Sequence, residues 1–406
     1  MTKISVIALS VMMAVTAVSC TGGNVTVPDE TTVSTTAQTT TEVTTQQTDA
    51  GPVTGLIIPC EDNVKTLGRT YQGVSGLWCA LSGSGIEFTV KGATYCNVTL
   101  KGDMTALTGT SDQQARAAIY YNDNRAFDVM MDARKKEYTV FDGHDEKDCT
   151  IKVIKLSESA NSVFAIESIE TDGIIEPFPD KQMKLEFIGD SITCGYGVDD
   201  EDSSHHFSTK TEDCTKTYAY KTAQMLSADV SLCSFSGYGI SSGYSDGKTQ
   251  QKTQLVPLYY DKVGNSYSSF DDGVKPQNID WDHSRYEPDV IVINLGTNDN
   301  SWTKGKEDRI AEFTENYVGF IKHVREVHPD AYIICSLGIM GQELYPAVEA
   351  AAEGYRNETG DEKITCLKFD VQNMDDGIAA DWHPSEKTHE KAAMKLTLLI
   401  QELTQQ

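Results

Sequence analysis

The chain has 406 residues, and its 60 acidic residues outnumber 34 Lys and Arg, which gives a formal net charge of -26 at pH 7. No basic run occurs in the sequence, so a nucleic-acid-binding protein, which needs clustered cations against phosphate, is excluded. A hydrophobic content of 39% is ordinary for globular sequence. The chain beyond the first 50 residues is too long for one comfortable hydrophobic core, so we expect two domains.

The first 20 residues have the features of an export signal. An apolar run from Ile4 to Val18 follows Lys3, and it is too short to span a bilayer, so we predict a signal peptide at residues 1–19. The sequence Ala17-Val18-Ser19-Cys20 before Thr-Gly-Gly resembles a bacterial lipobox. We therefore expect a lipidated Cys20 and a cell-surface lipoprotein whose only link to the membrane is this anchor. Leu is usual where Ala17 stands, so ordinary cleavage near Ser19, giving a secreted protein, is the alternative.

A Thr-rich segment follows the signal. Twelve of the thirty residues 21–50 are Thr, a composition that cannot bury enough apolar surface to offset chain entropy. We predict a flexible linker at residues 20–56.

Residues 57–178 are dominated by period-two patterning. Apolar and polar residues alternate in Gly85–Lys91 and again in Cys96–Lys101. Turn clusters such as Asn122-Asp123-Asn124 and Asp142-Gly143-His144 separate the runs. Several short strands at this spacing predict an all-β sandwich domain. The remaining strand-like runs are Ile119–Tyr121, Phe127–Met131, Tyr138–Phe141, Ile151–Leu156 and Val163–Ile169.

From residue 179 to 406, short apolar runs alternate with helix-like stretches, of which Asp308–Val327 and Ser385–Leu403 are the clearest. This alternation predicts an α/β domain with a parallel, doubly wound sheet, whose site lies beyond the carboxyl ends of the strands. The five predicted strands are Lys184–Ile188, Asp229–Phe235, Asp289–Leu295, Ala331–Leu337 and Ile364–Val371.

Two short motifs at predicted strand ends suggest acyl-transfer chemistry. Ser191 follows a tight Gly-Asp turn, where its hydroxyl can face a cleft and its N–H can meet a developing oxyanion. Thr193 stands where a Gly-x-Ser-x-Gly elbow would need its second glycine, so this is not that motif. Gly237, after the second strand, can offer an unhindered N–H. Taken alone, each motif is also explained by a plain turn.

Two further motifs supply the remaining groups. Asn298 follows the third strand and can aim its side-chain N–H₂ at the same oxyanion, whereas we expect Asp299 to fix the loop. His383, just before the C-terminal helix, is the candidate general base because its ordinary pKa lies close to neutral pH.

Together and in this order, Ser191, Gly237, Asn298 and His383 match the block pattern of the SGNH or GDSL hydrolases. The resemblance implies a flavodoxin-like domain with a five-stranded parallel sheet in three layers. It also implies that Ser191 and His383 are catalytic, and that Ser191, Gly237 and Asn298 form the oxyanion hole.

Further motifs resemble carbohydrate esterase family 2 over residues 60–404. They are Gly68-Arg69-Thr70-Tyr71, Ser82-Gly83-Ser84-Gly85-Ile86-Glu87-Phe88 and Asp381-Trp382-His383-Pro384-Ser385. This family implies a jelly-roll-like sandwich before the hydrolase domain. It implies a serine esterase that removes O-acetyl groups from plant polysaccharides such as xylan and glucomannan, without metal or cofactor. The alternatives are an SGNH esterase or lipase for other acyl esters, and a polysaccharide-binding surface protein with little activity.

The acid that usually accompanies the catalytic histidine is missing. The SGNH pattern places Asp three residues before the histidine, and Ala380 stands there. Asp381 is the histidine-orienting acid only if it bends round to accept the Nδ1–H of His383. Otherwise a backbone carbonyl accepts that proton and the pair is a Ser–His dyad, which is the alternative that we favour.

Other residues are less informative. Trp302 and Trp382 are candidate sugar contacts, with core packing equally compatible. His205 and His206 follow the acidic run Asp199–Asp202, which we interpret as a solvated loop rather than a metal site. Nine Cys follow Cys20, so at least one thiol is free in an exported protein, and the sequence does not reveal a pairing.

Overall fold

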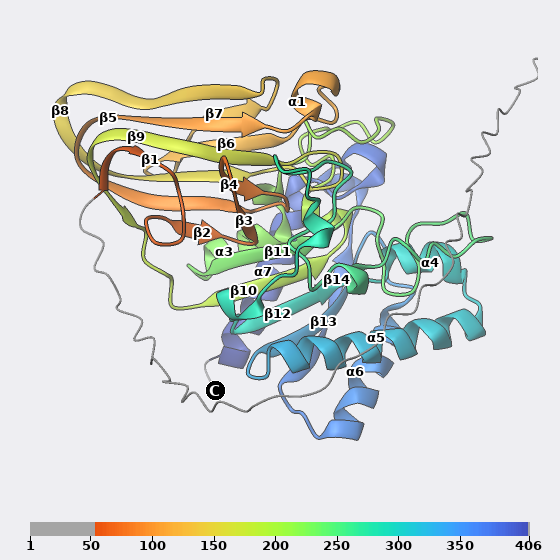
Figure 1. Cartoon of the computed structure of the whole chain (residues 1–406). Helices are drawn as coiled ribbons and strands as arrows, with labels where there is room; N and C mark the ends of the chain where they lie inside the picture. Colours follow the sequence, from red (N-terminus) through yellow and green to blue (C-terminus); the bar gives the residue numbers. More distant parts are fainter. Residues whose placement is uncertain (1–52, 405–406) are drawn as a thin grey trace, which may run out of the picture. The chain divides into compact units, whose positions relative to one another are not determined.

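A computed structural model of the chain describes residues 53–404 (Figure 1). The predicted signal peptide, Cys20 and the linker up to residue 52 lie outside these residues and stay predictions. Val53–Ile57 forms β1, which pairs with β9, so regular structure begins before residue 56, where we expected the linker to end. Among the described helices, none has both the length and the apolar character needed to cross a membrane.

The N-terminal region is antiparallel, as the alternating pattern predicts. Its sheet runs β3-β4-β9-β5-β8-β6-β7, with β1 added to β9 and β2 to β5. The strands are β2 (Lys65–Leu67), β3 (Thr70–Gly73), β4 (Gly76–Cys79), β5 (Gly85–Gly102), β6 (Arg116–Tyr121), β7 (Asn124–Met130), β8 (Lys135–Lys155) and β9 (Phe164–Pro177), with the short helix α1 (Thr105–Thr108) after β5.

Three of these strands are much longer than the short strands that we expected. Gly85–Lys91 and Cys96–Lys101 are two halves of β5, joined across irregular pairing between Val90 and Tyr95. The prediction of a turn at Asp142-Gly143-His144 is wrong, because these residues lie inside β8. Polar, exposed residues there let the strand bend without reversing direction. Asn122 and Asp123 do form the hairpin turn between β6 and β7, both with positive φ.

Alternate side chains of these strands build one apolar core. Ile86, Phe88 and Val90 of β5 are fully buried, and so are Ile151 and Val153 of β8. Period-two burial is what places one face of each strand inward. The nine cysteines in the described residues carry free thiols, and most of them, including Cys335, are buried.

The second region contains the predicted five-stranded parallel sheet, in the order β11-β10-β12-β13-β14. This is the flavodoxin-like order 2-1-3-4-5, whose switch point lies between the first and third strands. All five predicted strands are confirmed. The elements are β10 (Lys184–Gly189), α2 (Ser191–Cys194), α3 (Tyr218–Met225), β11 (Asp229–Ser234), β12 (Val290–Asn294), α4 (Thr297–Thr303), α5 (Glu307–Val327), β13 (Tyr332–Ile339), α6 (Tyr345–Thr359), β14 (Ile364–Val371) and α7 (Glu386–Thr404).

Helices cover both faces of this sheet and give three layers (Figure 1). Ile291 and Ile293 of β12 pack in the cluster that includes α5 and α6. Val290 and Val292 of the same strand pack in the cluster that includes α3 and α7. A strand that is apolar on both faces is the signature of a parallel sheet buried between helices.

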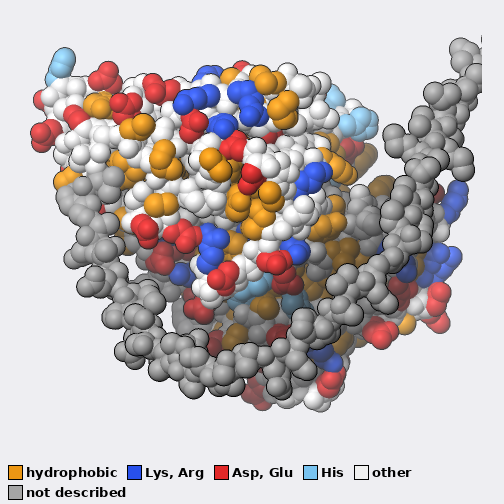
Figure 2. Space-filling model, viewed as in Figure 1, with side chains coloured by type: hydrophobic (Ala, Val, Ile, Leu, Met, Phe, Trp, Pro, Cys, Tyr) orange, Lys and Arg blue, Asp and Glu red, His pale blue; other side chains and the backbone are white. Residues whose placement is uncertain are grey.

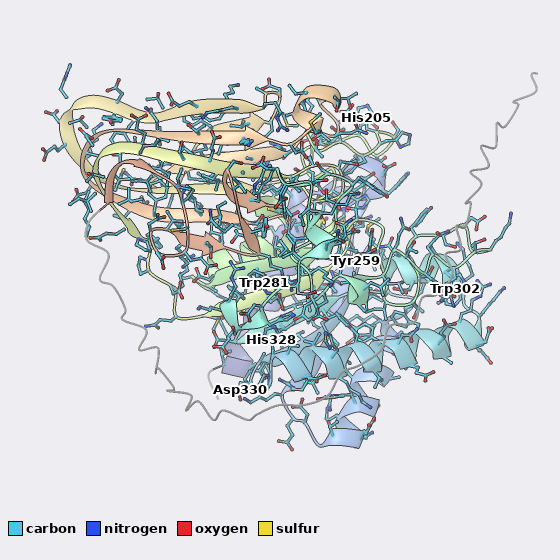
Figure 3. The ribbon with its side chains drawn as sticks, viewed as in Figure 1. His205, Tyr259, Trp281, Trp302, His328 and Asp330 are labelled. Atoms are coloured by element: carbon cyan, nitrogen blue, oxygen red, sulfur yellow. The ribbon has the colours of Figure 1, made fainter. Side chains whose placement is uncertain are left out.

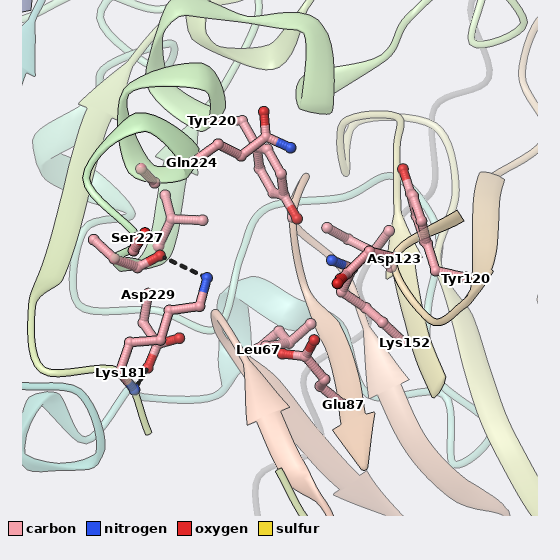
Figure 4. Close-up of a pocket in the computed structure, with 15 residues that line it drawn as sticks. Leu67, Glu87, Tyr120, Asp123, Lys152, Lys181, Tyr220, Gln224, Ser227 and Asp229 are labelled. Atoms are coloured by element: carbon pink, nitrogen blue, oxygen red, sulfur yellow. Dashed lines mark hydrogen bonds between the residues drawn. The ribbon is translucent and has the colours of Figure 1, made fainter. Parts of the chain in front are cut away.

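The sandwich and the α/β region meet across buried ion pairs. Arg69 contacts Glu186 at 3.0 Å, and Lys65 contacts Asp229 at 2.7 Å. Beside them, a cavity of about 310 Å³ is lined by Leu67 and Lys152 on the sandwich side and by residues such as Asp229 opposite (Figure 4). Breaking one partner of a buried pair costs several kcal/mol, so these contacts fix the two regions against each other.

Candidate active site

Ser191 is the first residue of α2, directly beyond the carboxyl end of β10, which lies between β11 and β12 in the sheet. Asp190 caps the helix, because its side chain accepts a hydrogen bond from the N–H of Ile192 at 3.0 Å. The N–H of Ser191 has no partner within the helix, as for any first helical residue. Both the hydroxyl and the N–H of the serine are thus presented at the switch point of the sheet.

The structure brings His383 to Ser191. His383 Nε2 lies 2.8 Å from Ser191 Oγ, and its Nδ1 lies 3.1 Å from the carbonyl oxygen of Ala380. With Nδ1–H donating to that carbonyl, Nε2 is free to accept the serine proton. The Ser–His pair therefore has the geometry of a dyad, with a backbone carbonyl in the position of the usual acid.

Asp381 is directed away from the imidazole. Its two carboxylate oxygens bind Tyr196 Oη at 2.5 Å and His206 Nδ1 at 2.8 Å. Its backbone has a left-handed conformation, with φ of 48°, and its N–H donates to the carbonyl of His205. Asp381 therefore does not hydrogen-bond His383, although it lies only two residues before it.

Tyr196 connects Asp381 to His383. The Tyr196 ring stacks on the imidazole with centroids 3.9 Å apart and an interplanar angle of 14°. Burial acts to raise the pKa of Asp381, but the hydrogen bonds from Tyr196 and His206 lower this pKa below its ordinary value. The carboxylate thus anchors the tyrosine that stacks on His383.

His383 is buried, with 8% of its surface exposed. Burial lowers the pKa of His383 to about 4, and the hydrogen bond to the Ala380 carbonyl only partly opposes this. The imidazole is therefore neutral at neutral pH, which is the form that can take a proton from Ser191.

Gly237 lies in the loop after β11, and Asn298 lies in the first turn of α4, after β12. Gly237 has a φ of 81° and no heavy atom within 4 Å of where a Cβ would stand. Its N–H has no acceptor among residues 53–404. Asn298 donates from Nδ2 to the carbonyl of Tyr238 at 2.8 Å and lies 3.4 Å from Asp190 Oδ2. The first bond ties Asn298 to the Gly237 loop, and the longer 3.4 Å contact with Asp190 is the one that an oxyanion would have to replace.

Asp299 fixes the adjoining loop, as we expected. Its buried carboxylate accepts the backbone N–H groups of Ile240, Ser241 and Ser242. Burial raises the pKa of Asp299 to about 6, despite these three hydrogen bonds.

The two candidate sugar-contacting tryptophans differ in how far their side chains are exposed. Trp382, next to His383, is 58% exposed. Trp302 is only 5% exposed, and the Arg309 guanidinium lies 4.9 Å from its ring. In Figure 3 Trp302 lies on α4, well apart from His205 in the loop that contacts Asp381. Core packing therefore accounts for Trp302, whereas Trp382 offers a free ring beside the base.

Glu158, Cys194 and Glu212 form a buried group whose possible ligand atoms lie within 4.8 Å of one another. Hydrogen bonds already occupy much of it. Glu158 Oε2 accepts from Ser236 N, Glu212 Oε2 accepts from Glu158 N, and Cys194 Sγ donates to Ser234 Oγ. Glu212 Oε1 is buried without a hydrogen-bond partner among the described residues. His205 contacts Asp200 in an exposed loop, as we expected of a solvated segment.

Sequence reasoning missed Glu158 and Tyr196. Glu158 follows a strand pattern as one acidic residue among serines, and Tyr196 lies five residues after the nucleophile. Neither position carries a local signal, because each acts through a contact with a residue far away in the sequence.

Comparison with known proteins agrees with this geometry. The family model described as GDSL-like lipase/acylhydrolase matches residues 187–391, about half of the chain, and the carbohydrate esterase 2 N-terminal model matches residues 66–179. The chain therefore belongs to the GDSL-like acylhydrolases, which are carboxylic ester hydrolases. Its particular combination of domains is that of the family 2 carbohydrate esterases.

Individual relatives support the same family assignment. The chain is 35% identical over 223 residues to cellulase/esterase CelE of Acetivibrio thermocellus, covering 54% of this chain but only 25% of that protein's length. It is 24% identical over 353 residues to an acetylxylan esterase / glucomannan deacetylase of Cellvibrio japonicus, covering 86% of this chain and 91% of the relative.

Solved structures show the same fold. A family two carbohydrate esterase from Clostridium thermocellum, in complex with cellohexaose, superposes with a TM-score of 0.70 at 27% identity, covering 86% of this chain and 99% of the other. The acetyl xylan esterase Est2A from Butyrivibrio proteoclasticus gives 0.75 at 23% identity, covering 85% and 96%.

Proposed function

We propose that the protein is a serine esterase that removes O-acetyl groups from plant cell-wall polysaccharides such as xylan and glucomannan. The observation that carries the proposal is the 2.8 Å contact between His383 Nε2 and Ser191 Oγ, next to two prospective oxyanion donors. Relatives named acetylxylan esterase / glucomannan deacetylase support the choice of substrate.

The residues account for both halves of the reaction. Neutral His383 takes the proton of Ser191 as Oγ attacks the acetyl carbonyl, and the N–H groups of Ser191, Gly237 and Asn298 receive the oxyanion. As the bond between the acetyl carbon and the sugar oxygen breaks, protonated His383 gives its proton to that oxygen, which leaves as a sugar hydroxyl, and acetyl-Ser191 remains. Water, activated by the same imidazole, releases acetate and restores the serine.

The surroundings suit a sugar better than a lipid. The whole chain has a net charge of -26, and Figure 2 shows carboxylates interspersed with apolar and basic side chains on one face of the molecule. The exposed ring of Trp382 beside His383 offers a flat apolar surface of the kind that stacks on a sugar ring. The Clostridium thermocellum relative was solved with cellohexaose, which supports an oligosaccharide as ligand.

An acyl-chain series tests the proposal. Acetate release from acetylated xylan and glucomannan is compared with hydrolysis of p-nitrophenyl esters of increasing chain length. We expect efficient release of acetate and little hydrolysis of long chains. A preference for long acyl chains would instead indicate a lipid esterase, and binding of polysaccharide without acetate release would indicate a binding protein.

We also propose that the protein is exported and anchored by a lipid on Cys20, since Ala17-Val18-Ser19-Cys20 resembles a lipobox. Mass spectrometry of the N-terminal peptide from the native host tests this. Diacylglyceryl-modified Cys20 is expected, whereas cleavage near Ser19 without modification would indicate a secreted protein.

A further inference from the structure

We propose that Glu158, a residue of the sandwich region, is a positioning residue of the esterase site, holding the loop that carries the Gly237 oxyanion donor. This inference rests on the proposed function and deepens it. It assigns to the N-terminal region a direct role in the catalytic geometry.

The contact is made to the peptide next to the oxyanion donor. Glu158 Oε2 accepts the backbone N–H of Ser236 at 2.9 Å. The peptide after Gly237 is also held, because the Gly237 carbonyl accepts the N–H of Tyr244 at 2.8 Å. Gly237, with no side chain and a φ of 81°, lies between these two fixed points. Its N–H direction therefore depends on both of them, since glycine itself gives the backbone little restraint.

Glu158 also reaches the helix that carries the nucleophile. Its Oε2 lies 3.9 Å from Cys194 Sγ, and Cys194 and Ser191 are the two ends of α2. Cys194 Sγ in turn lies 3.2 Å from Ser234 Oγ at the end of β11. One carboxylate thus lies between the nucleophile helix and the oxyanion loop, where it can set their spacing.

The segment that carries Glu158 is itself held rigidly. The buried Lys155 ammonium donates to the carbonyl oxygens of Ser157 and Glu158, each at 2.7 Å. The N–H of Glu158 donates to Glu212 Oε2 at 2.8 Å. Glu158 is 3% exposed, while Lys155 and Glu212 are fully buried. These bonds and the one to Ser236 N hold both the backbone and the carboxyl group of Glu158, so its side chain has little freedom to move.

Three substitutions separate positioning from bulk stability. Glu158→Gln keeps an oxygen that can accept from Ser236 N, Glu158→Leu has a similar size without an acceptor, and Glu158→Ala removes both. The matched control is Asp229→Asn, which weakens the Lys65 ion pair between the same two regions. Asp229 begins β11, at the end opposite to the site.

Kinetics are measured on p-nitrophenyl acetate. Active-site titration with an organophosphonate ester counts the competent serines, so that kcat refers to folded enzyme only. Oxyanion contacts act on the transition state, so the loss should fall on kcat and leave KM unchanged. We expect Glu158→Leu and Glu158→Ala to lower kcat about 10- to 100-fold, below the roughly 10²–10³ of losing a donor outright. Glu158→Gln should stay within about threefold of wild type, and Asp229→Asn within about twofold.

The two failures are distinguishable. If wild type hydrolyses p-nitrophenyl acetate but Glu158→Leu or Glu158→Ala matches Glu158→Gln in kcat, the role of Glu158 is overturned and the esterase function stands. A change in KM alone, or an equal loss of kcat in Asp229→Asn, overturns the role of Glu158 in the same way. If wild type hydrolyses no acetyl ester, the proposed function fails, and the role of Glu158 with it.

Discussion

Asp381→Asn tests whether the histidine is oriented by a carbonyl or by a carboxylate. Asn is nearly the same size as Asp and tolerates the left-handed backbone at this position. The substitution removes the negative charge while the Ala380 carbonyl continues to accept from Nδ1 of His383. The imidazole should therefore keep its tautomer and its contact with Ser191.

The expected loss is small because Asp381 reaches the imidazole only through the stacked ring of Tyr196. A looser tyrosine and one lost negative charge raise the barrier by about 1 kcal/mol, which is less than tenfold in kcat/KM. Removing the carboxylate of a true triad in a serine protease costs about 10⁴. A loss of less than tenfold and a loss of about 10⁴ are far enough apart for one experiment to distinguish a Ser–His dyad from a triad that includes Asp381.

The assay is steady-state hydrolysis of p-nitrophenyl acetate by Asp381→Asn and by Tyr196→Phe. Tyr196→Phe is the matched control, because it deletes the same hydrogen bond and keeps the ring on His383. We expect both variants to lose less than tenfold. A loss near 10⁴ in Asp381→Asn, with Tyr196→Phe little changed, would falsify the dyad and make Asp381 the third catalytic member.

Four further results are expected. His383→Ala should abolish deacetylation in a folded protein, and the double variant with Ser191→Ala should be hardly slower, because the pair acts as a unit; additive losses in kcat would argue against this pairing. Asn298→Ala should lower kcat about 10²–10³ with little change in KM, and a change confined to KM would remove it from the oxyanion hole. Because burial lowers the pKa of His383 to about 4, kcat/KM should stay high as the pH falls and decline only near pH 4; a midpoint near 6.5 would mean a solvated histidine. Incubation with EDTA should leave the rate unchanged, whereas a large loss restored by a divalent cation would show that a metal participates.

Much of the fold can be predicted from the sequence because the buried apolar residues of a strand recur at short intervals along the chain. The apolar run within Asp289–Leu295 predicts a strand of the parallel sheet, and the structure has β12 at Val290–Asn294, with apolar residues on both faces. The same reasoning divided β8 wrongly, because Asp142-Gly143-His144 has turn chemistry in a place where the strand only bends. Composition alone does not distinguish a bend in a paired strand from a reversal of the chain, since both need polar, exposed residues.

The site was predictable where a motif sits at a strand end, and not where a contact spans the chain. Ser191 and His383 are 192 positions apart, yet each can be identified because it lies in a short motif that the sequence shows by itself. The carbonyl of Ala380 carries no side-chain signal at all. Glu158 contacts Ser236 from 78 positions away, and nothing near either residue indicates the other.

The most direct test of the account is the release of acetate from acetylated xylan and acetylated glucomannan by the wild-type protein and by Ser191→Ala, at matched concentration and with equal thermal stability confirmed. We expect wild type to release acetate from at least one of these polymers, and Ser191→Ala, in which hydrogen replaces the nucleophilic hydroxyl, to release none above the uncatalysed rate. Retention of most of the acetate release by Ser191→Ala, or absence of release by wild type from both polymers, would contradict it.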